Sequence, residues 1–211
     1  MKFKFKISLM FLILVSFDNS SAQTVIQKDT IIKKDTSNNS SQFIQPETEI
    51  TLRFNNLKLA PLNIRLIFND FFKKYIGIKE SLVYNDSYGA GSKTLILLDE
   101  MKSKSDEVMK EINDARWEIF MQNYNSIRNK VKDIKFISDQ RFTFSEISRG
   151  LQSFIKQYGL HDQTLYLMYY KDPDTNQNKY WLSDKRDNKN PYLGTMDDSA
   201  NVKIKEVWIY E

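Results

Sequence analysis

The sequence predicts a mainly α domain of the α+β class, an antiparallel bundle of about four helices with a small C-terminal antiparallel β-sheet. Between Pro61 and Gly159, apolar side chains recur at steps of three and four residues in four successive segments, which is the spacing of amphipathic helices. After Gly159, short runs rich in aromatic and aliphatic residues alternate with turn-forming runs, which is the pattern of strands. Helices with short connections pack as a bundle, and a sheet buries its apolar face against such a layer.

Residues 1–22 have the pattern of a removable signal peptide. Three lysines within the first six residues precede an apolar run, 7–17, which is too short to span a bilayer. Ser20-Ser21-Ala22 then places small residues at the positions that a signal peptidase reads. Cleavage after Ala22 leaves Gln23 as the first residue and lowers the net charge from +4 to +2. The alternative is an uncleaved N-terminal anchor. We expect a periplasmic or secreted protein, with no later segment apolar enough to cross a membrane.

Residues 23–48 are predicted to form a flexible tether, followed by a single domain over 49–211. The tether is rich in Ser, Thr, Asn and Lys, and it has no sustained apolar period. Such a segment buries too little apolar surface to offset the entropy lost on ordering. At the start of the domain, Ile50, Leu52 and Phe54 alternate with polar residues, which is typical of a short strand.

The first three helices follow from their apolar stripes and their terminal residues. Pro61 opens the first helix, where its missing N–H does no harm. Asp86-Ser87 provides a cap for a second, shorter stripe that ends before the charged run 99–110. In the third helix the apolar residues recur at near-heptad spacing from Trp117 to Ile134.

The fourth helix and three strands complete the predicted domain. This helix is expected to begin after Ser138-Asp139 and to end at Gly159, because glycine adopts the left-handed conformation that stops helices. The strands are predicted over 164–170, 179–182 and 202–210, with polar turns between them. We expect this small sheet to pack on the bundle.

Several short phrases, taken in their order, resemble one bacterial protein family. The phrases are 78–83 (IKESLV), 140–148 (QRFTFSEIS), 181–183 (WLS) and 190–194 (NPYLG), followed by Met196. Over about residues 60–207 this pattern is similar to the family known as domain-of-unknown-function 3347. The resemblance implies an exported domain that occurs alone or on periplasmic adaptor subunits of heavy-metal efflux systems. An envelope or efflux-system protein is therefore the implied partner.

The same resemblance raises the possibility of a soft-metal site. The family's Cys-Pro-Met and Met…Cys-Gly phrases imply sulfur ligands, and sulfur selects Cu(I) and similar ions. In this chain the two cysteine positions hold Tyr170 and Ser199, so Met196 alone remains of the sulfur set. A copper ion here would use Met196 with Met168 and His161. The alternative is that Met168 fills a gap in the core and that His161 caps helix carbonyls.

The run from Asp172 to Asn176 partly matches a calcium-binding loop. Asp172, Asp174 and Asn176 have the spacing of its first three ligands. Gln177 replaces the required glycine, however, and Ser183 stands where the bidentate glutamate belongs. We therefore interpret this run as a polar hairpin turn.

Aromatic residues are concentrated in the predicted sheet and in the segment after it. They either line a ligand groove or pack the sheet onto the helices, and packing is the favoured interpretation because aromatic residues are common in strands. Alternation along the strand predicts one face for Tyr166, Met168 and Tyr170. The six residues concerned are Tyr166, Tyr169, Tyr170, Tyr180, Trp181 and Tyr192.

Composition and missing motifs narrow the class of protein. Acidic and basic residues are interspersed, so the chain has no clustered basic face for nucleic acid, despite a pI near 9.0. The chain has one histidine, no cysteine, no nucleophile elbow and no phosphate-binding glycine loop, and we do not expect an enzyme. The leading hypothesis is an exported, non-catalytic binding or accessory domain of the cell envelope that needs no cofactor. The alternative is a copper-binding protein.

Overall fold

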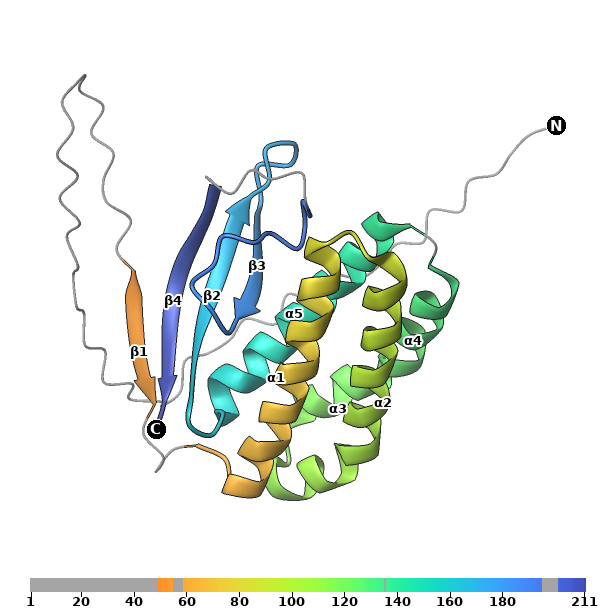
Figure 1. Cartoon of the computed structure of the whole chain (residues 1–211). Coiled ribbons are helices and arrows are strands. Elements are labelled where there is room, and N and C mark those ends of the chain that lie inside the picture. Colours follow the sequence, from red (N-terminus) through yellow and green to blue (C-terminus); the bar gives the residue numbers. More distant parts are fainter. Residues whose placement is uncertain (1–48, 55–58, 135, 195–200) are drawn as a thin grey trace, which may run out of the picture.

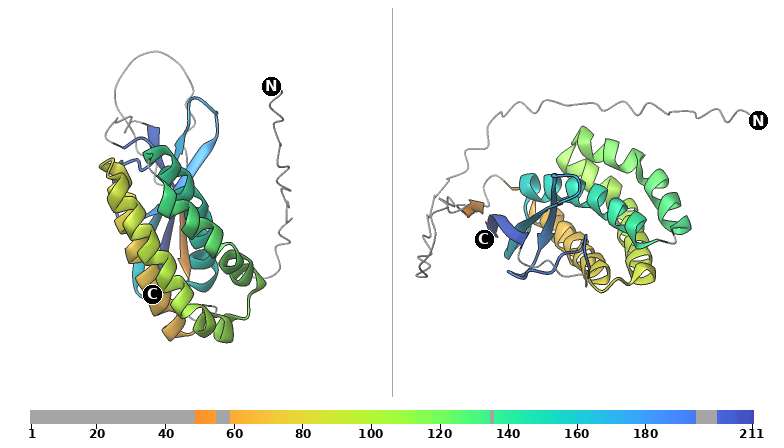
Figure 2. Two further views of the ribbon diagram at one scale, coloured as in Figure 1. Left: turned by 90° about the vertical axis from the view of Figure 1, so that its right-hand side faces the viewer. Right: turned by 90° about the horizontal axis from the view of Figure 1, so that it is seen from above.

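A helical layer packs against one small sheet in the computed structural model (Figure 1). The structure describes residues 49–54, 59–134, 136–194 and 201–211, so the predicted signal peptide and tether lie outside the described residues. Viewed from above, α1 and α5 lie nearest the sheet and the other helices lie beyond them (Figure 2). In chain order the elements are β1 (Ile50–Phe54), α1 (Leu62–Val83), α2 (Ser87–Ile112), α3 (Ala115–Gln122), α4 (Tyr124–Asp133), α5 (Ile137–Tyr158), β2 (Gln163–Lys171), β3 (Asn178–Ser183) and β4 (Val202–Tyr210).

The predicted mainly α fold with a small sheet is confirmed, and the strongest helix predictions match closely. α1 follows Pro61 directly, and α5 ends at Gly159, whose φ of 83° is unfavourable for residues with a Cβ. The start of α5 differs from the prediction: the helix begins at Ile137, and no side chain caps it. α2 continues through the charged run, because Met101 and Val108 lie at helical spacing within it and are fully buried.

The third predicted helix is broken into α3 and α4 at Asn123. The side-chain amide of Asn123 donates to the carbonyl oxygen of Ile119 at 3.0 Å, and so competes with the helical bonding pattern. The two segments also pack in different hydrophobic clusters. Trp117 of α3 lies in the main core, whereas the apolar residues of α4 pack against Leu98 of α2 in a second, smaller cluster. One continuous stripe in the sequence is therefore divided between two packing sites.

The sheet has the order β1-β4-β2-β3 and is mixed, so the expectation of an antiparallel sheet is wrong in one pairing. β2 runs antiparallel to both β3 and β4, but β1 pairs with β4 in parallel, with Leu52 opposite Trp208. The helices α1 to α5 lie between β1 and β4 in the chain, and a connection of that length allows a parallel pair.

A register irregularity in β2 breaks the strand alternation that the sequence predicts. The pairing of β2 with β4 shifts between Leu167 and Met168, and both of these neighbours are buried. Tyr170 is also buried, whereas Tyr166 is half-buried, with the guanidinium of Arg186 5.1 Å from its ring centroid. The burial pattern therefore departs from the single face predicted for Tyr166, Met168 and Tyr170.

A pH-dependent link joins α2 to α4. The carboxylate of Asp99 accepts hydrogen bonds from Arg128 Nε at 2.7 Å and from the Tyr124 hydroxyl at 2.5 Å. These bonds lower the pKa of Asp99 from 3.8 to about 2, with that from Arg128 the larger cause. Because the folded-state pKa is depressed, the stabilisation is present above about pH 4 and is lost as the pH falls through about 2.

Asp99→Asn is therefore expected to lower the free energy of unfolding by about 0.5–1 kcal/mol at neutral pH, a modest value because the carboxylate is half exposed. Urea unfolding at several pH values measures the difference from wild type, which should shrink towards zero near pH 2. Asp106→Asn, at an exposed position of the same helix, is the matched control and should change little. A loss for Asp99→Asn that does not vary with pH would contradict the assignment.

Candidate functional site

α5 carries a polar stripe on the side that borders β3. Five polar residues recur at steps of three and four, which places them on one side of the helix. The apolar residues Phe144, Ile147, Leu151 and Phe154 are buried in the core on the other side. The stripe consists of Ser138, Arg141, Ser145, Arg149 and Gln152.

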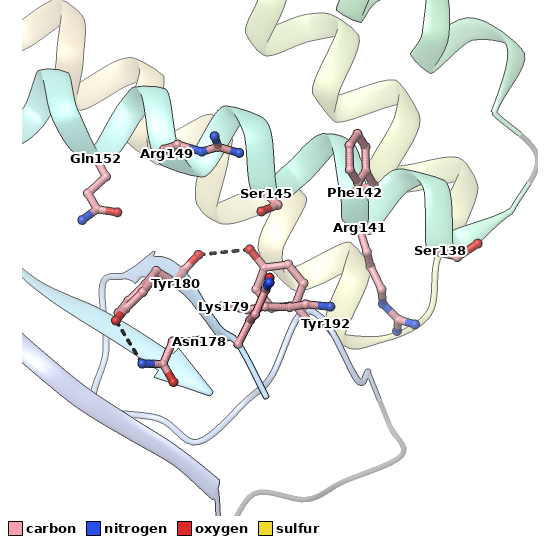
Figure 3. A pocket seen from close by; sticks show the side chains of 11 residues that line it. Ser138, Arg141, Phe142, Ser145, Arg149, Gln152, Asn178, Lys179, Tyr180 and Tyr192 are labelled. Carbon is pink, nitrogen blue, oxygen red and sulfur yellow. Dashed lines mark hydrogen bonds between the residues drawn. The ribbon is translucent and has the colours of Figure 1, made fainter. Parts of the chain in front are cut away.

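This stripe forms one wall of a pocket of about 650 Å³ (Figure 3). The opposite wall comes from β3, from the end of the β2–β3 turn and from Tyr192. Figure 3 shows Ser145 and Arg149 on α5 across from Tyr180 and Tyr192. The full lining is Ser138, Arg141, Phe142, Ser145, Arg149, Gln152, Gln177, Asn178, Lys179, Tyr180 and Tyr192.

Among the described residues, the lining contains three cationic side chains and no carboxylate. Lys179 is neutralised from outside the lining, because its ammonium group lies 2.8 Å from the buried carboxylate of Asp172. Arg141 donates to neutral acceptors, the Pro191 carbonyl at 3.0 Å and Asn85 Oδ1 at 2.6 Å, and burial lowers its pKa. Arg149 is exposed and makes no hydrogen bond or ion pair with the described residues. The pocket therefore favours an anion.

Tyr192, in the wall opposite α5, is held by hydrogen bonds and ring contacts. Its hydroxyl donates to the Tyr180 carbonyl at 3.0 Å, and its backbone N–H donates to Asn190 Oδ1 at 2.9 Å. The ring lies 5.8 Å from that of Phe144 on α5 and 6.0 Å from that of Trp181 on β3, measured between centroids. Burial raises the pKa of Tyr192 to about 12, so the hydroxyl stays neutral at physiological pH. Tyr192 thus couples the two walls of the pocket.

Buried polar contacts fix α1 against β3 beside the pocket. The Tyr75 hydroxyl accepts from the Leu182 N–H at 3.2 Å and lies 2.7 Å from Ser148 Oγ on α5. Lys79, which is only 1% exposed, donates to Ser183 Oγ at 3.0 Å. These bonds join three elements that are far apart in the sequence, and so hold the walls at a fixed spacing.

The phrases that carry the family resemblance meet around these contacts. Lys79 belongs to the first phrase and contacts Ser183 of the third. Arg141 belongs to the second phrase and bonds Pro191 of the fourth. Gly194, the last residue of that phrase, has a φ of 68°, and a Cβ at this position would collide with Asn85 and Arg141. The shared phrases therefore build the corner at which α1, α5 and β3 meet.

Fold and pocket together define a mainly α domain with a four-stranded mixed sheet and a cationic surface pocket. A family model described as a protein of unknown function (DUF3347) matches residues 71–163, from the middle of α1 to the start of β2. The resemblance inferred from the sequence is thereby confirmed over this part of the chain, while the phrases at 181–194 lie beyond the matched residues. No curated protein and no solved structure matches the chain.

The structure describes two of the three predicted copper ligands, and these two lie at different places along the chain. His161 lies in the turn before β2, where its backbone N–H and carbonyl both bond the side chain of Asn69 at 3.0 Å. Met168 is buried in β2, opposite Trp181 of β3. His161 precedes the first residue of β2, Gln163, whereas Met168 is the sixth residue of that strand. Met196 lies outside the described residues, and its role stays a prediction.

In the described part of the chain, no three His, Cys, Asp or Glu side chains lie together as a metal centre would require. None of the helices in the described ranges combines the length and apolar character needed to cross a membrane.

The partial calcium loop is a hairpin turn between β2 and β3, as the sequence indicates. The Asp172 N–H and carbonyl bond Gln177 and Asn176 at 2.9 and 2.8 Å, which closes the turn. Asp172 also accepts from the Asp174 N–H at 3.1 Å, while the ammonium group of Lys179 lowers the pKa of Asp172. This carboxylate is therefore occupied by groups of the protein itself.

Aromatic residues contribute both to packing and to the pocket. Trp181 and Tyr170 are buried, as the packing interpretation predicts, but Tyr180 and Tyr192 line the pocket. The polar stripe of α5 was not among the sequence-based candidates. Its signal was present in the spacing of Arg141, Ser145 and Arg149, a polar face with two arginines and no acid.

Proposed function

We propose that this chain is an exported, non-catalytic binding domain of the bacterial cell envelope, and that the pocket between α5 and β3 is its binding site. The observation that carries the proposal is the lining, in which cationic, aromatic and neutral polar side chains converge in about 650 Å³. Pockets of this size, with a few convergent polar groups, are characteristic of small-molecule sites.

The chemistry of the lining supports binding in preference to catalysis. The lining residues that the structure describes include no Asp, Glu, His or Cys, the side chains that most often transfer protons or act as nucleophiles near neutral pH. Tyr192, with a pKa of about 12, remains protonated. The lining residues hold and orient a ligand through charge, hydrogen bonds and ring contacts.

The family resemblance supports the place of this domain in the cell. We propose that it is an accessory protein related to the domains associated with metal efflux, with an envelope or efflux-system protein as partner. It lacks the cysteines of those domains at Tyr170 and Ser199. The retained phrases contribute to the corner beside the pocket, where Lys79 contacts Ser183 and Arg141 contacts Pro191.

The proposed export can be tested at the N-terminus of the mature protein. When the full chain is produced in a bacterial host, the protein in the periplasmic or secreted fraction is expected to begin at Gln23, which intact-mass measurement determines. Ala22→Arg removes the small residue before the cleavage site and should leave the unprocessed form. Full-length protein confined to the cytoplasm would contradict the proposed export, whatever its binding properties.

Binding in the pocket is tested with the exported protein itself. We expect equilibrium dialysis against a small-molecule envelope extract, followed by mass spectrometry, to find compounds retained by wild type and not by Arg149→Ala. Lys130→Ala removes the same charge from an exposed position on α4 and should retain them. Identical retention by wild type and Arg149→Ala would contradict the pocket as the binding site.

A further inference from the structure

Arg149 supplies the charge and the N–H donors that an oxyanion requires. Gln152 lies one turn after it on the same face of α5, so the two Cβ atoms are about 5–6 Å apart. Ser145 lies one turn before Arg149, and its side chain hydrogen-bonds Tyr192. The guanidinium carries five N–H donors in a planar fork that fits carboxylate or phosphate oxygens. No carboxylate is among the described lining residues, so none of these residues competes with the ligand for this charge.

The remaining lining suits a hydroxylated ring. Gln152, Gln177 and Asn178 carry amides, which both donate and accept hydrogen bonds as a hydroxyl group requires. The side chains of Gln152 and Gln177 have no hydrogen-bond partner among the described residues. Phe142 is 64% exposed at the pocket wall, so its ring offers an uncovered apolar surface to the C–H face of a ligand.

We propose that the pocket binds a sugar that carries an oxyanion, a sugar acid or a sugar phosphate, with the anion at Arg149 and the ring against Phe142. This inference rests on the proposed function, that the pocket is the binding site. A purely apolar ligand leaves Arg149 and the amides of Gln152 and Gln177 unpaired, and a simple inorganic anion leaves the exposed ring of Phe142 unused.

The test is isothermal titration of the exported protein with five probes: D-galacturonate, glucose-6-phosphate, neutral galactose, acetate and inorganic phosphate. At least one charged sugar is expected to bind at least tenfold more tightly than galactose and than the free anion with the same charged group. Whichever of the two charged sugars binds more tightly identifies the preferred anion as carboxylate or phosphate.

Variants locate the binding. Arg149→Ala should lower the affinity for the charged sugar by about tenfold to a hundredfold, which corresponds to the loss of one charge-assisted hydrogen bond. Arg149→Lys should lower it less. Phe142→Ala should lower the affinity for the charged sugar and leave the affinity for the free anion unchanged. Lys130→Ala should change neither affinity. Thermal unfolding checks that each variant is folded. No binding of either charged sugar at millimolar concentration, or equal binding of galactose, overturns the inference. An unrelated ligand retained through Arg149 in the dialysis experiment would overturn it and leave the proposed function standing.

Discussion

Replacing Trp117 with alanine is expected to lower the free energy of unfolding by about 4 kcal/mol. Trp117 is completely buried in the main core. Its indole N–H donates to Ser105 Oγ at 3.2 Å. Its ring contacts those of four phenylalanines, with centroid distances of 5.9, 6.1, 6.2 and 5.1 Å for Phe68, Phe71, Phe120 and Phe154. The substitution therefore leaves a large cavity where α1, α3 and α5 meet, together with an unpaired buried hydroxyl.

Chemical denaturation of wild type, Trp117→Ala and Trp117→Phe measures this effect. The phenylalanine variant keeps most of the ring contacts but loses the hydrogen bond to Ser105, so its loss should be about 1–2 kcal/mol. A loss below about 2 kcal/mol for Trp117→Ala would contradict the central position of Trp117 in the core.

The second large effect is expected at Lys79, whose side chain is only 2% exposed. Its ammonium group donates to Ser183 Oγ at 3.0 Å and lies 3.8 Å from Asp184 Oδ1 and 3.6 Å from Asp187 Oδ2. Removing one partner of a buried ion pair costs about 3–5 kcal/mol. Because both carboxylates reach solvent, Lys79→Met should cost less, about 2 kcal/mol in the free energy of unfolding.

A double-mutant cycle separates the charge interaction from packing. Asp187→Asn removes one of the carboxylates, and in the Lys79→Met background it should cost less than in wild type, because its partner charge is already absent. Strict additivity of the two substitutions would show that Lys79 and Asp187 do not interact. Since Ser183 ends β3, Lys79→Met should also weaken ligand binding in the pocket.

The sequence pattern predicted a helix best where its whole apolar stripe packs into a single hydrophobic cluster. The stripe of α1 is buried along its length, and Pro61 and Gly159 mark helix ends that backbone chemistry determines. The break at Asn123 was not predictable, because it depends on two clusters that form only in the folded protein. The strand at 50–54 was recognised by alternation, but its parallel partner β4 lies at the other end of the chain.

The candidate site was likewise predictable only in part. Tyr180 and Tyr192 were candidates because aromatic residues stand out in a sequence. Arg149 and Ser145 read as an ordinary solvated face of a helix, and they become a site only because Tyr192 and the β2–β3 turn are folded across from them. The family phrases contact one another in the folded protein, as Arg141 and Pro191 do, and these contacts were not visible in the sequence.

The most direct test of the proposed site is a titration of the isotope-labelled protein with the stronger-binding charged sugar, followed by amide NMR. The amide signals that move should belong to 138–152 of α5, to 177–180 and to Tyr192, and they should stay in place in Arg149→Ala. Shifts concentrated on α2 to α4, or shifts that are the same in wild type and Arg149→Ala, would contradict a binding site between α5 and β3.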